Sequence, residues 1–433
     1  MKKIILVMTT DKNYIMPTRV TLYSILDSAK DDTFYEIHIM CDKELDTESK
    51  ENILELLQYT DRIQIEFNDV SDYFPEGIKA YGRFSIASYF RLFISQVVDA
   101  DKCIFIDGDT IVRIDLGELY DIDISDYYVA GARNTKKLLS DNYKEKLDIP
   151  SLDEYINAGV LIFNLKKIRE DNINKKFVEA IPDNYRMMDQ DIINKYCFGK
   201  IKVLPLKYNF FTEYYGIRVS KIEDSVFTDM ELQEAEREWK ILHYTGTLKT
   251  WLCTRLKVNQ IWWQYAERAL RKEDYIVQVE KAREFEKESD WTYILDRINR
   301  ETNIVIVGFS EIGKKLFDIL KRLKPKETIV ICDNDDRKYQ MHYQGVQIQS
   351  VEKTGLLYPD AIWIVASQTG YDTIKKQLIG IGVEGKKVIR YVHKSEIYYE
   401  GLDERYRKYE MQMLEKISDT KYRVHEQEDR YHL

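Results

Sequence analysis

Residues 102–109 contain a short apolar stretch typical of a β-strand, Lys102-Cys103-Ile104-Phe105-Ile106, directly followed by the acidic triplet Asp107-Gly108-Asp109. In open α/β sheets, ligands bind beyond the carboxyl ends of the strands. An acidic pair at such a place lets two carboxylates turn toward one point, and because they repel each other they favour a bound cation. The alternative is an ordinary strand-end turn, in which Asp and Gly are common. A divalent cation at a sheet edge most naturally bridges a diphosphate, so the stretch indicates phosphate-linked donor chemistry.

Strand and helix patterns alternate on the N-terminal side of this stretch. Apolar strand-like runs lie at Ile4 to Met8, Glu36 to Cys41 and Ile63 to Phe67. Amphipathic or helix-like stretches follow at Pro17 to Ala29, Asp46 to Tyr59 and Ser85 to Val97. This order predicts an α/β fold with parallel strands and crossover helices.

The pattern restarts late in the chain. Between Gly246 and Gly308 there is no glycine or proline, and the spacing predicts a helical connector. A new strand at Asn303 to Val307 then opens a second small α/β domain. We expect a nucleotide-binding domain over 1–258, a connector over 259–300, a Rossmann-like domain over 301–400 and a charged, helical tail over 401–433.

Composition excludes several classes of protein. The chain has 433 residues, 44% of them hydrophobic, so it can bury a sizeable core, and its formal charge of 65 − 74 = −9 argues against phosphate-neutralising nucleic-acid binding. No apolar run is long enough to span a bilayer, and the first is shorter than a secretory signal core. The five cysteines form no CxxC pair and are expected to be reduced, so we predict a cytoplasmic protein.

Further polar residues are placed at the same sheet edge by the strand pattern. Thr9 to Tyr14 follow the first strand, and Asn157-Ala158 stand beside a later apolar run. Asp189-Gln190-Asp191 head an amphipathic stretch, where either aspartate could instead cap a helix. His243 ends a short apolar run, where a lone histidine can equally be structural.

Taken together and in order, these motifs resemble the retaining glycosyltransferases of family 8, which include glycogenin and lipopolysaccharide galactosyltransferases. The similarity runs from Ile5 to about Trp251. Its motifs are Thr9-Thr10-Asp11-x-Asn13-Tyr14, Ser88-Tyr89-x-Arg91-Leu92, Asp107-x-Asp109, Asn157-Ala158-Gly159-Val160, Asp189-Gln190-Asp191 and His243-Tyr244-x-Gly246-x-x-Lys249-x-Trp251. Each motif is weak alone, but six in the correct order outweigh the structural alternatives.

The resemblance implies a GT-A type domain that binds a UDP-hexose and a divalent cation. It implies that Asp107, Asp109 and His243 ligate the metal, a ligand set that suits Mn²⁺ better than Mg²⁺. The residues implied at the donor site are Thr9, Thr10, Asp11, Asn13 and Tyr14 near the uridine, Gly108 between the acids, Gly246 and Lys249 at the diphosphate, and Arg91, Asn157, Ala158, Asp189 and Gln190 around the sugar.

The resemblance also implies transfer of glucose or galactose with retention, giving an α-linkage to a saccharide, glycolipid or protein, as in bacterial surface-polysaccharide synthesis. Lys249 is expected to stabilise the leaving diphosphate. Gln190 and Asp189 are candidates beneath the sugar, but an amide is a poor nucleophile, and same-face attack is an open alternative. The mixed charges of the tail do not favour membrane docking, and the sequence leaves the oligomeric state undecided.

The second domain carries a partial dinucleotide fingerprint. Gly308-Phe309-Ser310-Glu311-Ile312-Gly313 follows a strand and opens a helix, with Asp333 at the end of the next strand. Serine replaces the middle glycine of this fingerprint. We therefore favour the interpretation that the glycines serve only the turn and the helix packing. The alternative is a nucleotide site in this domain, which would make the chain an NAD-linked enzyme. A second alternative function is a catalytically weak scaffold that binds a nucleotide sugar.

Overall fold

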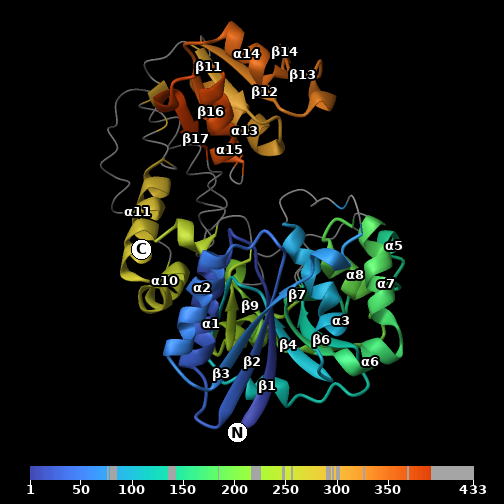
Figure 1. Cartoon of the computed structure of the whole chain (residues 1–433). Coiled ribbons are helices and arrows are strands. Elements are labelled where there is room, and N and C mark those ends of the chain that lie inside the picture. The colour runs from blue at the N-terminus through green and yellow to red at the C-terminus, as the bar shows by residue number, and fades with distance from the viewer. Residues whose placement is uncertain are drawn as a thin grey trace. The chain divides into compact units, whose positions relative to one another are not determined.

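A computed structural model of the chain (Figure 1) describes residues 1–75, 78, 85–134, 143–183, 185–215, 226–245, 249–254, 257–288, 294, 297–298, 303–324, 327–367 and 370–391. By contacts the chain divides into two compact units. The first comprises Met1–Thr245 and Ile261–Tyr275, and the second comprises Gly246–Gln260 and Ile276–Leu433. The tail predicted over 401–433 lies outside the described residues.

The first unit is built on a mixed sheet of seven described strands in the order β3-β2-β1-β4-β7-β6-β8. These strands are β1 (Lys2–Thr9), β2 (Thr33–Cys41), β3 (Ile63–Asp69), β4 (Lys102–Ile106), β6 (Val129–Arg133), β7 (Ile156–Asn164) and β8 (Ile201–Leu204). The strands β3, β2, β1 and β4 are parallel, as predicted, whereas β7 runs antiparallel to both β4 and β6. The carboxyl end of β4 therefore faces the beginning of β7.

Helices cover both faces of this sheet (Figure 1). The helices up to Thr245 are α1 (Ile15–Asp27), α2 (Thr47–Leu54), α3 (Ile94–Val97), α4 (Gly117–Tyr120), α5 (Tyr143–Leu147), α6 (Leu165–Glu170), α7 (Ile173–Ala180), α8 (Asp189–Tyr196) and α9 (Asp229–Arg237). Two more helices follow along the chain, α10 (Lys257–Ala269) and α11 (Lys272–Glu288), and each is divided between the two units. The strand β1 shows why both faces of the sheet are covered. Its alternating residues Ile5 and Val7 join the core under α6, α7 and α8, while Ile4, Leu6 and Met8 join the core under α1 and α2.

The predicted helix at Ser85 to Val97 is mostly a 3₁₀-helix, η3 (Ile86–Phe93), followed by the single α-helical turn of α3. In a 3₁₀-helix side chains three residues apart eclipse, so Ser88 and Arg91 lie on one line. The Arg91 Nε donates to the Ser88 carbonyl at 3.2 Å. The predicted helix is therefore confirmed, with a 3₁₀ part that carries Arg91.

A small sheet extends the edge where β4 ends. It has the order β5-β10-β9, from β5 (Thr110–Val112), β10 (Ile241–His243) and β9 (Phe210–Phe211). Since β5 begins directly after Asp109, strands from three distant parts of the chain meet beside the acidic pair.

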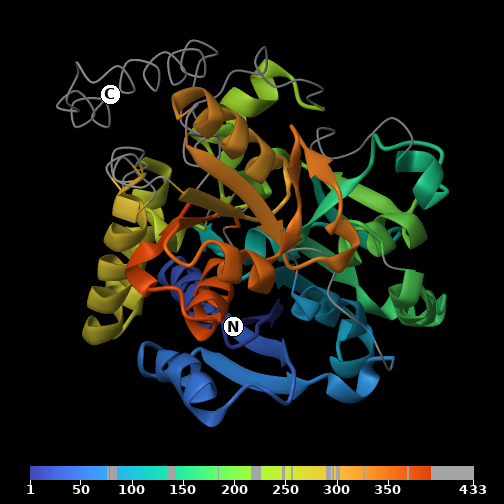
Figure 2. The same ribbon diagram turned by 90° about the horizontal axis from the view of Figure 1, so that it is seen from above.

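The second unit contains a parallel sheet in the order β15-β12-β11-β16-β17, with helices on either side (Figure 2). Its elements are β11 (Asn303–Val307), α13 (Glu311–Leu323), β12 (Thr328–Asp333), β13 (His342–Tyr343), β14 (Val346–Gln347), β15 (Gln349–Ser350), α14 (Val351–Leu357), β16 (Ile362–Val365), α15 (Tyr371–Gly380) and β17 (Val388–Arg390). The strand predicted at Asn303 to Val307 is confirmed at those bounds.

Two further findings bear on the sequence predictions. All five cysteines lie in described parts of the chain, and each is free and buried. Among the described residues, no helix combines the length and the apolar character needed to cross a bilayer.

Candidate active site

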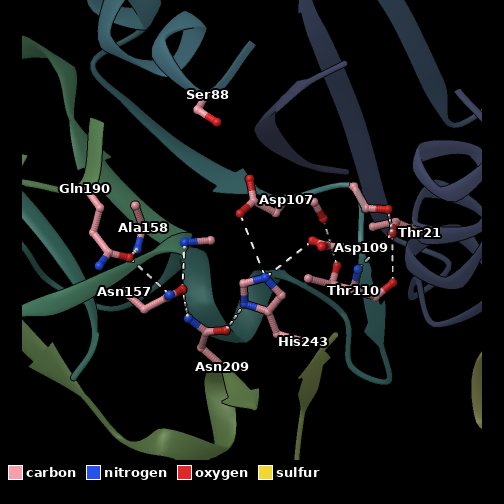
Figure 3. Close-up of polar contacts among 12 residues, drawn as sticks. Thr21, Ser88, Asp107, Asp109, Thr110, Asn157, Ala158, Gln190, Asn209 and His243 are labelled. Carbon is pink, nitrogen blue, oxygen red and sulfur yellow. Dashed lines mark hydrogen bonds and ion pairs between the residues drawn. The ribbon is translucent and has the colours of Figure 1, made fainter. Parts of the chain in front are cut away.

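The acidic pair sits in a turn held by helix α1. A Cβ on Gly108 would lie 2.5 Å from the Oγ1 of Thr18, so only glycine fits there without displacing that hydroxyl. The Thr21 hydroxyl lies 2.9 Å from the carbonyl oxygen of Gly108 and 2.7 Å from that of Thr110 (Figure 3). The turn is therefore rigid, and it places the carboxylates of Asp107 and Asp109 at the sheet edge.

His243 reaches the same place through strand pairing. In the small sheet His243 pairs with Thr110 on the antiparallel strand β5 and with Phe211 on the parallel strand β9. Its Nε2 lies 3.3 Å from Asp109 Oδ1 and 3.9 Å from Asp107 Oδ2. Ligand atoms of Asp107, Asp109 and His243 all lie within 4.8 Å of one another, so the predicted metal ligands come together.

The backbone opposite this cluster leaves room for nothing larger than glycine. A Cβ on Gly159 would lie 2.2 Å from His243 Cε1 and 2.8 Å from Asp107 Oδ2. Asp109 and His243 are buried at 6% and 4% exposure. Two carboxylates and an imidazole in a close, largely buried cluster fit a divalent cation.

Arg91 ties the acidic cluster to helix α8. Its Nη2 lies 2.8 Å from Asp107 Oδ1 and its Nε lies 3.0 Å from Asp189 Oδ2. Its Nη1 also donates to the Ala158 carbonyl, and its guanidinium carbon lies 4.3 Å from the centre of the Phe105 ring. One planar side chain thus fixes two carboxylates and a backbone carbonyl, which a lysine could not do.

Burial sets the electrostatics of this pair. Desolvation opposes the charge of Arg91, but the carboxylates of Asp107 and Asp189 hold its pKa above the ordinary value. Burial raises the pKa of Asp189 to about 7, against the opposing charge of Arg91. The charge of Asp107 raises that pKa further, so a cation neutralising Asp107 would favour the ionised form of Asp189.

Gln190, at the start of α8, and Asn157, at the start of β7, lie next to each other. The Gln190 Oε1 accepts from Asn157 Nδ2 and from the Ala158 backbone N–H, both at 3.1 Å. The Gln190 Nε2 donates to the Tyr155 hydroxyl at 3.1 Å. The side chains predicted around the sugar, from Arg91 to Gln190, therefore form one hydrogen-bonded group with Asp107.

The two aspartates at the start of α8 have different roles. Asp191 accepts from the hydroxyls of Tyr143 (2.5 Å) and Tyr155 (2.6 Å) and from the Met187 N–H, so it is a buried structural anchor. Asp189 does not cap the helix, since its carboxylate pairs with Arg91 instead. Met188, just before it, has φ +50 and ψ −121, which L-residues rarely adopt and which is typical of functional sites.

The predicted uridine residues lie where β1 ends. Thr9 is the last residue of β1 and Tyr14 directly precedes α1. Asp11 accepts from the Asn13 N–H at 2.8 Å and from the Ser85 hydroxyl at 2.7 Å, which ties this loop to the start of η3. Thr10 is 1% exposed, and its hydroxyl lies 3.2 Å from that of Thr18, so it supports the Gly108 turn from within.

The residues predicted at the diphosphate are only partly described. Gly246 lies outside the described residues. Lys249 is half-buried, with its Nζ 5.9 Å from the centre of the Trp251 ring, and it belongs to the stretch grouped with the second unit. Their roles stay predictions.

Asn209 belongs to the site but was not predicted from the sequence. This residue is 0% exposed and lies directly before β9, and its amide contacts both His243 and Asn157 at 2.9 Å. The available signal was a polar residue directly before the apolar pair Phe210-Phe211, which many loops share.

In the second unit, the residues of the partial fingerprint contact one another. Gly308 has φ +113, and a Cβ on Gly313 would lie 1.9 Å from the Gly308 carbonyl oxygen. Asp333 Oδ2 accepts from the Phe309 N–H at 2.6 Å and pairs with Lys338 at 2.9 Å. These contacts support the interpretation that the glycines serve the turn and the helix packing.

Comparison with known proteins agrees with this geometry. The family model of glycosyl transferase family 8 matches residues 5–254. The lipopolysaccharide 1,2-glucosyltransferase of Escherichia coli is 27% identical over 172 residues, which cover 39% of this chain and 49% of that protein. The lipopolysaccharide 1,3-galactosyltransferase of Salmonella typhimurium is 24% identical over 259 residues, which cover 56% and 71%.

Among solved structures, the galactosyltransferase LgtC, in complex with donor and acceptor sugar analogs, matches with a TM-score of 0.52 at 25% identity. The match covers 64% of this chain and all of LgtC. The fold class predicted from the sequence is confirmed. The matched family model and the clustered Asp107, Asp109 and His243 lead to one conclusion: the chain belongs to glycosyl transferase family 8.

Proposed function

We propose that this chain transfers glucose or galactose from a UDP-sugar to a saccharide, glycolipid or protein acceptor, with retention of the anomeric configuration. The proposed reaction needs a divalent cation, with Mn²⁺ preferred over Mg²⁺. The observation that carries the proposal is the convergence of Asp107, Asp109 and His243 beside Arg91 and Gln190. The named glucosyl- and galactosyltransferase activities of two relatives support the choice of hexose.

The chemistry follows from where charge develops. A divalent cation, when bound by this cluster, offsets the negative charge of the departing diphosphate. The protein's part is to hold the ligands still: Arg91 fixes Asp107 at 2.8 Å, and Asn209 contacts His243 at 2.9 Å. Rigid groups that need no rearrangement during the reaction provide electrostatic catalysis. We propose that Gly246 and Lys249 contact the diphosphate.

The contacts of Gln190 bear on how configuration is retained. Both lone pairs of its side-chain oxygen are engaged, by Asn157 Nδ2 and by the Ala158 N–H. The Asp189 carboxylate is engaged by Arg91. Neither group is free to attack the sugar without breaking these bonds, which favours same-face attack with the acceptor proton passing to the leaving phosphate. In that case Gln190 and Asp189 hold the donor in place.

The domain bounds and the cellular location are also proposals. The transferase domain is assigned to 1–258, the connector to 259–300 and the Rossmann-like domain to 301–400, and the cytoplasmic location stays a prediction. An NAD-linked activity is the less favoured alternative, because Ser310 replaces the middle glycine of the fingerprint and the glycines serve the turn and the helix packing.

The test is a screen of UDP-sugars for hydrolysis with Mn²⁺, with Mg²⁺ and after EDTA. We expect turnover of UDP-glucose or UDP-galactose with Mn²⁺ and none after EDTA. UDP-sugar binding without turnover would favour a catalytically weak scaffold, and full turnover after EDTA would contradict the metal site.

A further inference from the structure

A row of side-chain amides connects the metal-ligand cluster to the sugar side of the site. Asn209 lies in the middle of it, with its Oδ1 2.9 Å from His243 Nδ1 (Figure 3). Its Nδ2 donates to Asn157 Oδ1 at 2.9 Å, and Asn157 Nδ2 donates to Gln190 Oε1 at 3.1 Å. The row thus runs from Gln190 to His243.

Two backbone amides decide which way every group in this row points. The Gly159 N–H donates to Asn157 at 2.9 Å, and the Ala158 N–H donates to Gln190 at 3.1 Å. A backbone N–H can only donate, so the side-chain atom it meets is oxygen in each case. Asn157 therefore presents oxygen to Asn209. Asn209 must present its NH₂ group to Asn157, and that leaves its oxygen for His243.

This polarity has a consequence for the imidazole. An amide oxygen only accepts, so the ring nitrogen that faces Asn209 must carry the proton. In the neutral ring the other nitrogen, Nε2, then keeps its lone pair, and it faces Asp107 and Asp109 at 3.9 and 3.3 Å. A neutral imidazole with a free Nε2 lone pair is the form that ligates a metal.

We propose that Asn209 is a positioning residue that holds His243 as the Nδ1–H tautomer, so that Nε2 is available to a divalent cation. The inference rests on the proposed metal-dependent function. Histidine ligands often receive this support from a carboxylate. Here an amide supplies the acceptor without adding another negative charge beside Asp107, Asp109 and Asp189.

Two substitutions of similar size separate this role from mere packing. Asn209→Leu removes the acceptor, whereas Asn209→Asp keeps an oxygen that can accept from Nδ1. Binding of Mn²⁺ alone and of Mn²⁺ with UDP is measured by electron paramagnetic resonance of free Mn²⁺. We expect Asn209→Leu to weaken Mn²⁺ binding about 10- to 100-fold, the usual effect of losing such a partner. Asn209→Asp is expected to bind within about 3-fold of the wild type, well short of the loss from removing the acceptor.

The control is Asn164→Ala, at the opposite end of β7. Asn164 caps α6 by accepting from the Lys167 N–H at 3.0 Å, so its loss lowers Tm without touching the cluster. We expect this variant to bind Mn²⁺ like the wild type. Equal Mn²⁺ affinity in Asn209→Leu and wild type would overturn the inference, as would equal losses in the leucine and aspartate variants.

A measurement on the wild type needs no variant to fold. With ¹⁵N-labelled histidine, Mg²⁺ and UDP at mildly alkaline pH, NMR is expected to show the His243 proton on Nδ1, and a proton on Nε2 overturns the inference. A wild type that binds no divalent cation refutes the metal-dependent function and this inference with it. A wild type that binds Mn²⁺ while Asn209→Leu binds it equally well refutes only the inference.

Discussion

Substitution of Gly159 by alanine tests the close approach of β7 to the metal-ligand cluster. The new Cβ would lie 2.2 Å from His243 Cε1 and 2.8 Å from Asp107 Oδ2. Since ordinary carbon contacts are about 3.5 Å, the imidazole must move by roughly 1 Å. Metal-ligand distances tolerate only about 0.2 Å, so cation binding should fail even though the fold survives. Overpacking of this kind costs about 1–3 kcal/mol of stability.

The assay compares Mn²⁺ affinity, UDP-sugar hydrolysis and Tm for Gly159→Ala and Gly131→Ala. Gly131 lies on β6, and its Cβ would come 2.8 Å from Leu161 Cδ2 and 3.0 Å from Ile156 Cδ1, the ends of two flexible side chains. We expect both variants to lose some stability, but only Gly159→Ala to lose Mn²⁺ binding, by about 100-fold or more. Wild-type Mn²⁺ affinity in folded Gly159→Ala would refute the reasoning.

Four other predictions concern separate parts of the chain. Asp109→Asn should remove nearly all UDP-sugar hydrolysis while circular dichroism stays native, and residual wild-type turnover would contradict its role. Arg91→Lys should lower kcat/KM about 100-fold, because lysine cannot reproduce the planar set of contacts. The hydrogen bonds of Arg271 and Arg19 lower the pKa of Glu55 to about 2, below its ordinary value, so their stabilisation is complete above about pH 4.5 and is lost as the pH falls toward 2. Glu55→Gln should therefore cost about 1–2 kcal/mol at pH 7, measured by urea unfolding, and little near pH 2; a cost independent of pH would contradict this. NAD and UDP should not protect the amides around Gly308 in hydrogen exchange, and protection would show that the second unit binds a nucleotide.

Local patterns sufficed for much of the fold. The strand at Lys102–Ile106 and the strand at Asn303–Val307 were predicted at their observed bounds, because buried parallel strands are short apolar runs bounded by polar residues. The helix predicted at Ser85 to Val97 is confirmed, but its division into a 3₁₀ part and one α-helical turn was not predicted. The partners of Arg91 within this helix lie on other elements, which local periodicity does not reveal.

The order of the motifs indicated the family, which the matched family model confirms. The acidic pair after a strand indicated a cation site, but its neighbouring residues left an ordinary turn as the alternative until the other motifs were considered. The family resemblance implied that His243 joins that pair. Only the tertiary structure shows that strand β10 places it there, that Gly159 leaves it room and that Asn209 faces its ring. The physical reason is range. Periodicity and turn chemistry act over a few residues, whereas close approach and hydrogen-bond polarity depend on distances between strands that lie far apart in the chain.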